Sequence, residues 1–490
     1  MADQEQTPRT ANRSTTPISE AFRDFIQSDW DTLTPPTPPA AEFASHTAAR
    51  RERLGEHFLD TVVVIPAGDY KQRSHDTDYP YRPHTAFSYL TGWGSHTVPG
   101  SILVGLPTQD GRDWVLYFRP PAPRTSDEFY SNASLGEFWT GPRPGLAQIS
   151  SLLQIDTKDL EEWPELCASL TTAAVVSEAD PLVTKDILSH RINSEACGAL
   201  DDLLAQVLSE ARLIKDEWEV AQMREAIAAT HRGFNDIVQA LPSALGHERG
   251  ERIIEGAFHQ RARLEGNDTG YGTIAASGPH ACILHWVNND GPVEPGQLLL
   301  VDAGVELNSL YTADITRTMP VNGAFTPLQK QIYEAVLEAA DEAFAIVRPG
   351  IQFRDIHDAA LRVIAQRVSK WGFLPVDLEE SLSLQGQQHR RYMIHGTSHH
   401  VGLDVHDCAH ARREMYMDKE LEPGMVFTIE PGLYFQPDDT TVPPEWRGIG
   451  VRIEDNILVT ATGAENLSAL IPRTVAEVEN WVGRATPSLD

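Results

Sequence analysis

Cysteine, positive charge and long apolar runs are all scarce in this chain of 490 residues. The four cysteines, Cys167, Cys197, Cys282 and Cys408, are scattered and form no C-x-x-C pair. The sequence therefore predicts neither a disulfide framework nor a structural zinc site. Sparse cysteine of this kind fits a reducing compartment, and we expect the protein to be cytoplasmic.

Two further absences exclude whole classes of partner. No stretch approaches the roughly 20 apolar residues of a membrane span, and the first residues carry no basic or apolar region of a secretory signal. The 40 basic residues stand against 70 acidic ones, and the resulting net charge of −30 repels phosphate. We expect no membrane partner and no nucleic-acid partner.

Histidine, in contrast, is concentrated in one short stretch. Residues 395–407 read H-G-T-S-H-H-V-G-L-D-V-H-D, and their glycines argue against a single buried helix. Two aspartates precede this stretch and two glutamates follow it, namely Asp302, Asp314, Glu430 and Glu454. A lone histidine is more often structural than a ligand, but four in one stretch with these carboxylates indicate a metal centre.

The chain divides by composition into three parts. Residues 1–43 are a polar tail rich in proline and threonine, a composition that favours extended or disordered backbone. Residues 44–211 alternate apolar strands, such as 61–65, with helical segments, such as 157–170, and predict an α/β domain. Apolar residues at helical spacing predict one long helix from 194 to 227, which leads into a second domain, 212–490.

The second domain combines strands and helices. An apolar strand over 297–302 ends near Asp302, and 311–318 returns with Asp314, so a turn near residues 308–309 makes an antiparallel hairpin. We expect a second strand pair formed by 269–278 and 282–286. Helices at 327–347 and 353–371 cover one side of the sheet. Arg452 and Glu454 lie two apart, hence on one face of a strand.

The five candidate ligands predict a chemistry. Carboxylate oxygens with one imidazole suit Mn²⁺, Co²⁺, Fe²⁺ or Zn²⁺. Four carboxylates exceed the need of one divalent ion, so we expect two metals about 3.5–4 Å apart, with a bridging hydroxide that attacks a carbonyl. The region lacks H-E-x-x-H, G-x-S-x-G, Walker A and G-x-G-x-x-G patterns, which leaves metal-dependent hydrolysis. The ligands are Asp302, Asp314, His399, Glu430 and Glu454.

Several motifs resemble one known family. They are C-I-L-H, V-D-A-G, D-I-T-R-T, the His-rich stretch, P-G-M-V-F-T-I-E-P-G-L-Y and R-G-I-G-V-R-I-E-D, with D-Y-P-Y-R and F-S-Y-L-T-G in the first domain. The chain resembles the pita-bread metallopeptidases of family M24, and within them the aminopeptidase P group. This resemblance implies an N-terminal α/β domain followed by a catalytic domain whose curved antiparallel sheet is covered by helices.

The resemblance also implies a role for each site residue. The five ligands would hold two manganese ions, and Glu430 would accept a proton from the attacking water. His406 and His285 would steady the tetrahedral intermediate and the scissile peptide, and His395 would line the pocket for the proline side of the bond. Arg452 would orient the ligands.

The function implied is hydrolysis of the N-terminal Xaa-Pro bond in peptides whose second residue is proline. A prolidase, which cleaves Xaa-Pro dipeptides, is the alternative, because both activities share this ligand set. A non-catalytic binding protein on the same fold is the remote alternative, and it predicts lost ligands. The resemblance further implies a homo-oligomer, a dimer or tetramer, in which the first domain contacts a neighbouring subunit.

Overall fold

A computed structural model describes residues 18–31, 35–75, 77–109 and 111–484 of the chain. It contains two compact units, residues 1–208 and 209–490. Much of the predicted tail, residues 1–17 and 32–34, lies outside the described residues. Within the rest of that tail, helix α1 (Glu20–Ile26) is a correction to the expectation of extended backbone, because Ser19 caps it by accepting the Phe22 N–H.

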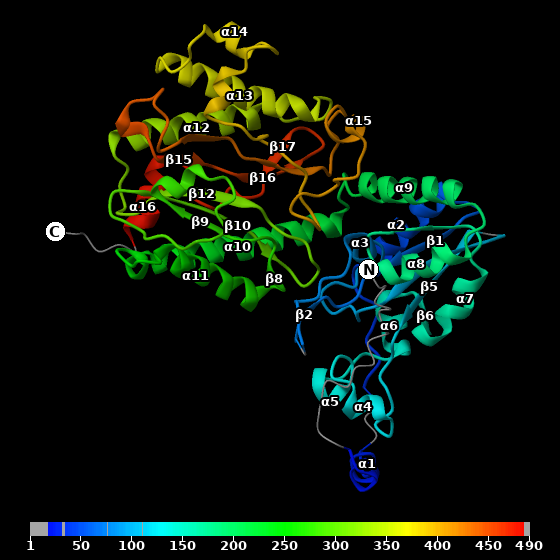
Figure 1. Cartoon of the computed structure of the whole chain (residues 1–490). Coiled ribbons are helices and arrows are strands. Elements are labelled where there is room, and N and C mark those ends of the chain that lie inside the picture. The colour runs from blue at the N-terminus through cyan, green and yellow to red at the C-terminus, as the bar shows by residue number, and fades with distance from the viewer. Residues whose placement is uncertain (1–17, 32–34, 76, 110, 485–490) are drawn as a thin grey trace, which may run out of the picture. The chain divides into compact units, whose positions relative to one another are not determined.

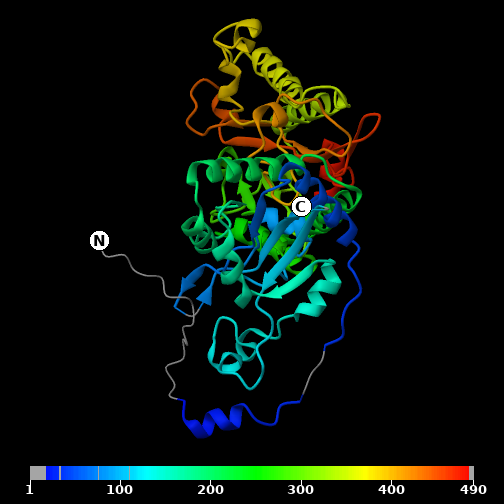
Figure 2. The same cartoon turned by 90° about the vertical axis from the view of Figure 1, so that its right-hand side faces the viewer.

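The first unit is built on a mixed five-stranded sheet with the order β6-β5-β4-β1-β7. The pairs β1–β4 and β4–β5 are antiparallel, whereas β1–β7 and β5–β6 are parallel. Figure 2 shows these strands side by side in blue and cyan. Its elements are α2 (Ala44–His57), β1 (Val62–Pro66), β2 (Gln72–Ser74), β3 (Thr77–Asp78), α3 (Thr85–Thr91), β4 (Ile102–Thr108), β5 (Gly111–Phe118), α4 (Asp127–Ser131), α5 (Glu137–Thr140), α6 (Leu146–Leu153), β6 (Asp156–Asp159), η1 (Leu160–Glu162), α7 (Trp163–Ser169), β7 (Ala173–Val175), α8 (Pro181–His190) and α9 (Ser194–Ala211).

Two helix predictions need correction. The segment 157–170 begins as strand β6, because its first residues pair with β5, and becomes helical only from Leu160. The predicted helix over 194–227 is two helices, α9 and α10 (Glu217–Ala244). Between them the backbone turns so that the buried side chains of Arg212 and Lys215 reach Asp407, at 2.8 and 3.7 Å. Two buried cations need a carboxylate partner. The turn between the two helices lets both side chains reach Asp407, and a continuous helix would not have to do so.

The second unit places its strands between two layers of helices (Figure 1). Helices α10 and α11 pack on the first half of the strands, and α12 packs on the second half with α13 beside it. Its further elements are α11 (Gly250–Glu265), β8 (Asp268–Thr269), β9 (Ile274–Ser277), η2 (Gly278–Cys282), β10 (Leu298–Ala303), β11 (Val305–Glu306), β12 (Ile315–Pro320), α12 (Pro327–Ala345), α13 (Phe353–Lys370), α14 (Leu378–Leu382), η3 (Gln388–Arg391), α15 (Arg413–Tyr416), β13 (Val426–Ile429), β14 (Gly432–Phe435), η4 (Pro444–Trp446), β15 (Ile449–Arg452), β16 (Asp455–Val459), β17 (Ala464–Asn466) and α16 (Val475–Gly483).

The strands of this unit are antiparallel to their neighbours. They form the groups β12-β10-β9, β11-β8, β13-β16-β17 and β14-β15. The predicted hairpin is confirmed, because β10 pairs with β12 around a turn at residues 308–309. The helices predicted over 327–347 and 353–371 are confirmed as α12 and α13.

The predicted strand over 282–286 is wrong. A 3-10 turn, η2, follows β9 directly, and residues 283–291 form an irregular loop. The partner of β9 is β10 instead. None of the helices in the described ranges is both long and apolar enough to cross a membrane.

Candidate metal centre

Asp302 and Asp314 face each other across the β10–β12 hairpin. Asp302 lies opposite Thr316 in the register, and Asp314 immediately precedes β12. The hydroxyl of Tyr271 lies 2.6 Å from an oxygen of each carboxylate. The hairpin therefore brings the two carboxylates together, as the sequence predicts.

The His-rich stretch reaches the same place because it runs beside β13. Thr428 donates its N–H to the His399 carbonyl at 2.9 Å, and Glu430 donates its N–H to the Thr397 carbonyl at 2.8 Å. These bonds set His399 next to the end of β13, where Glu430 follows the strand. His399 Nε2 lies 3.2 Å from Asp314, 3.5 Å from Glu430 and 4.0 Å from the fifth donor, Glu454.

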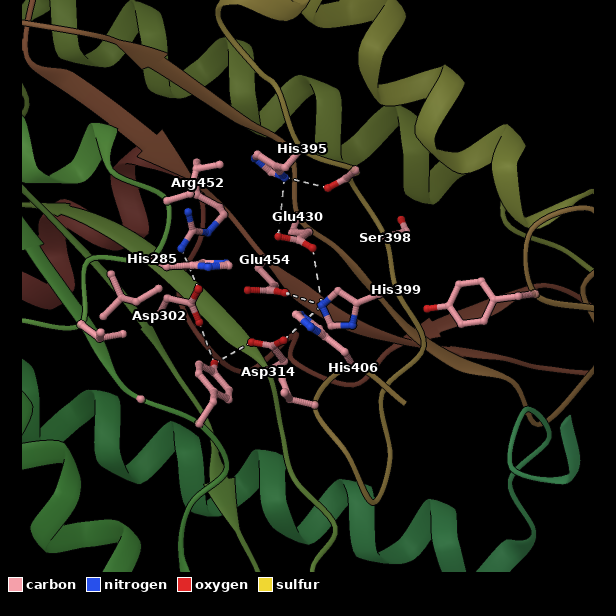
Figure 3. Close-up of a pocket in the computed structure, with 18 residues that line it drawn as sticks. His285, Asp302, Asp314, His395, Ser398, His399, His406, Glu430, Arg452 and Glu454 are labelled. Carbon is pink, nitrogen blue, oxygen red and sulfur yellow. Dashed lines mark hydrogen bonds and ion pairs between the residues drawn. The ribbon is translucent and has the colours of Figure 1, made fainter. Parts of the chain in front are cut away.

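Arg452 and Glu454 come from the β15–β16 connection. Arg452 is the last residue of β15, and its Nη2 donates to Asp302 at 2.6 Å. Glu454 lies between the two strands rather than inside one, and it accepts the Thr316 hydroxyl hydrogen bond at 2.7 Å. Both side chains point into one cavity (Figure 3), although they do not share one strand as predicted.

The five predicted donors and His406 form overlapping groups around one cavity of about 700 Å³. Within each group the ligand atoms lie within 4.8 Å of one another; the groups are Asp314–His399–His406, His399–Glu430–Glu454 and Asp302–Asp314–Glu454. The groups share members, so the donors form one centre.

The three other predicted histidines lie around these donors (Figure 3). The His406 ring packs edge-on against His399, with centroids 4.3 Å apart. His395 lies on the opposite side, where its Nε2 is 2.8 Å from the Tyr434 hydroxyl. His285 lines the cavity from the loop after η2 and is exposed.

Comparison with known proteins identifies the family. A model of metallopeptidase family M24 matches residues 221–461, and a model of the aminopeptidase P N-terminal domain matches residues 47–176. Xaa-Pro aminopeptidase 1 of Streptomyces coelicolor is 47% identical over 466 residues, which cover 95% of this chain and 92% of that protein. The chain belongs to metallopeptidase family M24.

Solved M24 structures agree with this assignment. Aminopeptidase PepP of Pseudomonas aeruginosa matches with a TM-score of 0.78 and 32% identity, covering 90% of this chain and 98% of that chain. Escherichia coli aminopeptidase P with the inhibitor Pro-Leu matches with a TM-score of 0.78 and 31% identity, covering 91% and 99%. The predicted fold, an α/β N-terminal domain followed by a pita-bread domain, is confirmed.

The donor set of this M24 chain fits divalent metal ions. Carboxylate oxygens with one imidazole are suitable ligands for such ions. The Tyr271 hydroxyl has a single hydrogen, so it cannot satisfy both Asp302 and Asp314 at 2.6 Å. His399 Nδ1 lies 3.2 Å from the His400 carbonyl, and this bond leaves Nε2 free to face the carboxylates.

The electrostatics of the centre also favour a bound cation. Burial raises the pKa of the Glu430 carboxyl to about 7, and burial with neighbouring carboxylates raises the pKa of Glu454 and of Asp314. Burial opposes a charge on His399, but its hydrogen bond to Asp314 and the charge of Glu430 raise its pKa to about 9. Positive charge placed among these carboxylates, such as that of a bound cation, would therefore stabilise their ionised forms.

The pKa values of His406 and His395 are lowered instead. Burial and the charge of His399 lower the pKa of His406 to about 4. Burial and the charge of Arg452 lower the pKa of His395 to about 4. Both rings are therefore neutral near pH 7 and can act as hydrogen-bond partners without adding charge.

Three residues of the centre were missed by the sequence analysis. Tyr271 contacts both aspartates, Thr316 contacts Glu454 and Arg452, and Tyr434 contacts His395 and Arg452. Thr316 and Tyr434 lie inside motifs used for the resemblance, and Tyr271 lies between two glycines. Threonine and tyrosine are common in ordinary strands, so their presence in a strand or turn gives no signal of its own.

A fourth missed residue, Glu251 of α11, fixes the loop that carries His285. The fully buried Glu251 carboxylate accepts hydrogen bonds from the N–H groups of Ser277 and Gly291, at 2.8 and 2.7 Å. It also accepts bonds from His280 Nδ1 and Trp286 Nε1, at 2.8 and 2.9 Å. Four donors from both ends and the middle of the loop thus converge on one carboxylate.

Proposed function

We propose that this chain is a metal-dependent aminopeptidase that hydrolyses the bond between an N-terminal residue and a following proline. The observation that carries the proposal is the convergence of four carboxylates and one imidazole in a cavity. The chain also has 47% identity, over 95% of its length, to a protein named Xaa-Pro aminopeptidase 1. A complete donor set argues against the non-catalytic alternative, which requires lost ligands.

Two divalent ions, most suitably manganese, would be held by the five donors, which are Asp302, Asp314, His399, Glu430 and Glu454. Support comes from the three overlapping donor groups and from the raised carboxyl pKa values of Glu430, Glu454 and Asp314. When bound, the ions supply a water activated for attack and polarise the scissile carbonyl. Their natural identity is a separate question from the chemistry, since several divalent ions suit these ligands.

Glu430 would accept the proton of the attacking water and pass it to the leaving proline nitrogen. Its support is its place among the donors that line the cavity, next to His399 at 3.5 Å. His406 and His285 would donate hydrogen bonds to the tetrahedral intermediate and the scissile peptide. Their support is the position of His406 against His399 and of His285 on the cavity wall.

The proline side of the bond would lie beside His395. This histidine contacts Tyr434, whose hydroxyl also accepts a bond from Arg452 Nη1 at 3.2 Å. Arg452 in turn would orient Asp302 through the 2.6 Å contact. The E. coli structure with Pro-Leu contains an inhibitor that begins with proline, which is consistent with such a pocket.

The first experiment compares a tripeptide Xaa-Pro-Pro with the dipeptide Xaa-Pro, using manganese-reconstituted protein and a chelated control. We expect cleavage of the tripeptide at the Xaa-Pro bond and loss of cleavage on chelation. Cleavage of the dipeptide alone would instead indicate a prolidase. Cleavage of neither substrate by a protein with two metals bound would contradict the proposal.

We also propose that the protein is cytoplasmic and forms a homo-oligomer, a dimer or tetramer, through its first domain. The cytoplasmic site is supported by four cysteines that all remain free thiols. Size-exclusion chromatography with light scattering measures the oligomer, and a monomer at micromolar concentration would contradict it.

A further inference from the structure

A second cavity adjoins the metal cavity, and apart from His395 its lining residues have no role in the proposed reaction. It has a volume of about 230 Å³. His395, Gly396 and Ser398 line both cavities, and Figure 3 shows His395 and Ser398 on one segment beside the donors. If proline lies beside His395, as proposed, the next residue of the peptide is near enough to enter this second cavity, because His395 lines it too. We call it the arginine cavity.

The arginine cavity differs in charge from the rest of the molecule. Its other lining residues are Phe353, Arg354, His357, Arg390, Thr397 and Met417. None of its lining residues in the described chain is acidic, although the whole chain has 70 acidic and 40 basic residues. A cavity with this lining favours an anion over a cation.

Arg390 has the most available charge in this cavity. Its guanidinium bonds only to neutral oxygens, Gln387 Oε1 at 2.6 Å and the Ile394 carbonyl at 3.4 Å. Arg354, in contrast, already lies 3.1 Å from the Asp418 carboxylate. No described carboxylate lies within ion-pair distance of Arg390, so a bound carboxylate would not have to displace one.

His357 adds a directed donor. Its Nδ1 lies 3.3 Å from the Thr397 N–H and 3.2 Å from the Thr397 hydroxyl; when Nδ1 accepts from the N–H, the ring proton is on Nε2 and can be donated. Burial lowers the pKa of His357; the charge of Asp358 opposes this shift and that of Arg390 adds to it, and the ring stays neutral near pH 7. Both side chains line this cavity, so a ligand there can take N–H donors from each.

We propose that the arginine cavity binds a carboxylate carried by the residue that follows proline. This inference deepens the proposed function, on which it rests, by naming a substrate class: short peptides with a carboxylate at the third position. The carboxylate can be the C-terminus of a tripeptide or an acidic side chain at that position. With one water taking about 30 Å³, the cavity has room for such a residue.

The test uses three substrates that separate the two sources of carboxylate. They are Ala-Pro-Ala, its C-terminal amide, and the amide of Ala-Pro-Glu. Loss of a charge-assisted hydrogen bond is worth about tenfold or more, so we expect kcat/KM for the acid to exceed that for the alanine amide by about tenfold. A high value for the glutamate amide would show that a side-chain carboxylate also binds.

Arg390→Ala is expected to bring the acid-to-amide ratio to about one, and Arg390→Lys to retain part of it, because lysine keeps the charge without the planar fork. Arg362→Ala is the matched control. Arg362 is an exposed arginine on the same helix as Arg354 and does not line the cavity. Its substitution should leave the ratio unchanged.

A binding measurement separates this inference from the proposed activity. Calorimetric titration of metal-reconstituted protein with Pro-Leu and with Pro-Leu amide should show the acid bound about tenfold more tightly, with the difference lost in Arg390→Ala. Equal binding of acid and amide, or a ratio unchanged by Arg390→Ala, would overturn the carboxylate site even if peptides are cleaved. Failure to cleave any peptide would overturn the proposed function. The ratio of the affinities for Pro-Leu and Pro-Leu amide would still test the carboxylate site.

Discussion

Glu430 has two proposed roles, as a metal ligand and as the group that accepts a proton. It lies 3.5 Å from His399 among the donors, and burial holds its pKa at about 7. Asp302, by comparison, receives a direct hydrogen bond from Arg452. Of these two carboxylates, Glu430 is therefore the better candidate for moving a proton during turnover.

Glu430→Gln should lower kcat by about 10²–10⁴-fold, the usual contribution of general acid–base catalysis. Steady-state kinetics and metal analysis of the same sample measure this. The control is Glu445→Gln, which removes an exposed carboxylate in η4 and should leave kcat unchanged. A Glu430→Gln protein with normal metal content and normal kcat would exclude the proposed role.

His406→Ala should lower kcat and leave metal content close to that of the unmodified protein. The ring belongs to one donor group, but the resemblance gives it a role in steadying the intermediate. His410→Ala is the control, since His410 is an exposed histidine of the same loop. If metal content and kcat fall together, His406 is a ligand instead.

At the scale of single residues, the sequence predicted which charged side chains would lie close together. Asp302 and Glu430 end apolar strands and His399 lies in the His-rich stretch, positions where charge is costly without a partner. The structure brings these side chains together, while their individual roles stay predictions. Tyr271 could not be predicted, because a tyrosine between glycines has many structural explanations.

Elements with local signals were predicted well, and elements fixed by distant contacts were not. The β10–β12 hairpin and helices α12 and α13 follow from periodicity and turn residues. The loop after η2 depends on Glu251, which lies in another element and is invisible to a local pattern. The break between α9 and α10 depends on Asp407 in the same way.

Glu251→Gln should destabilise the protein by at least about 2 kcal/mol, because an amide NH₂ would then face hydrogen-bond donors in a buried site. It should also lower kcat/KM, since the loop that carries His285 loses its fixed point. Urea unfolding and kinetics measure the two effects. Glu255→Gln on the same helix is the control, and no hydrogen bond of its side chain is found in the described chain.

A double variant tests whether Glu251 acts through His285. If it does, Glu251→Gln with His285→Ala should have the kcat/KM of His285→Ala alone. Fully additive losses would show that Glu251 supports the fold without positioning that histidine.

Over the whole molecule, the uncompensated carboxylates make metal content and stability interdependent. The folded pKa of Glu430, about 7, exceeds its unfolded value of about 4.3, and the folded pKa of His399, about 9, exceeds about 6.5. Both groups bind protons more tightly in the folded protein. Their stabilisation is complete below the unfolded pKa and is lost as pH rises through the folded pKa.

The metal-free protein should therefore become less stable between pH 5 and pH 9, whereas bound metal replaces the protons and opposes this loss. Thermal melts of chelated and manganese-reconstituted protein at several pH values measure the difference in Tm. We expect this difference to grow with pH. A difference in Tm that stays constant across this pH range would contradict the replacement of protons by metal at Glu430 and His399.

The contact between Arg452 and Asp302 joins residues 150 positions apart, and that between Glu454 and Thr316 joins residues 138 apart. Neither half of the second unit contains all five donors. During synthesis the donor Glu454 is made last, so a growing chain cannot hold its ions until both halves have packed. Metal capture should thus be a late event of biogenesis, and adding manganese at the start of refolding should not speed the slow, long-range step.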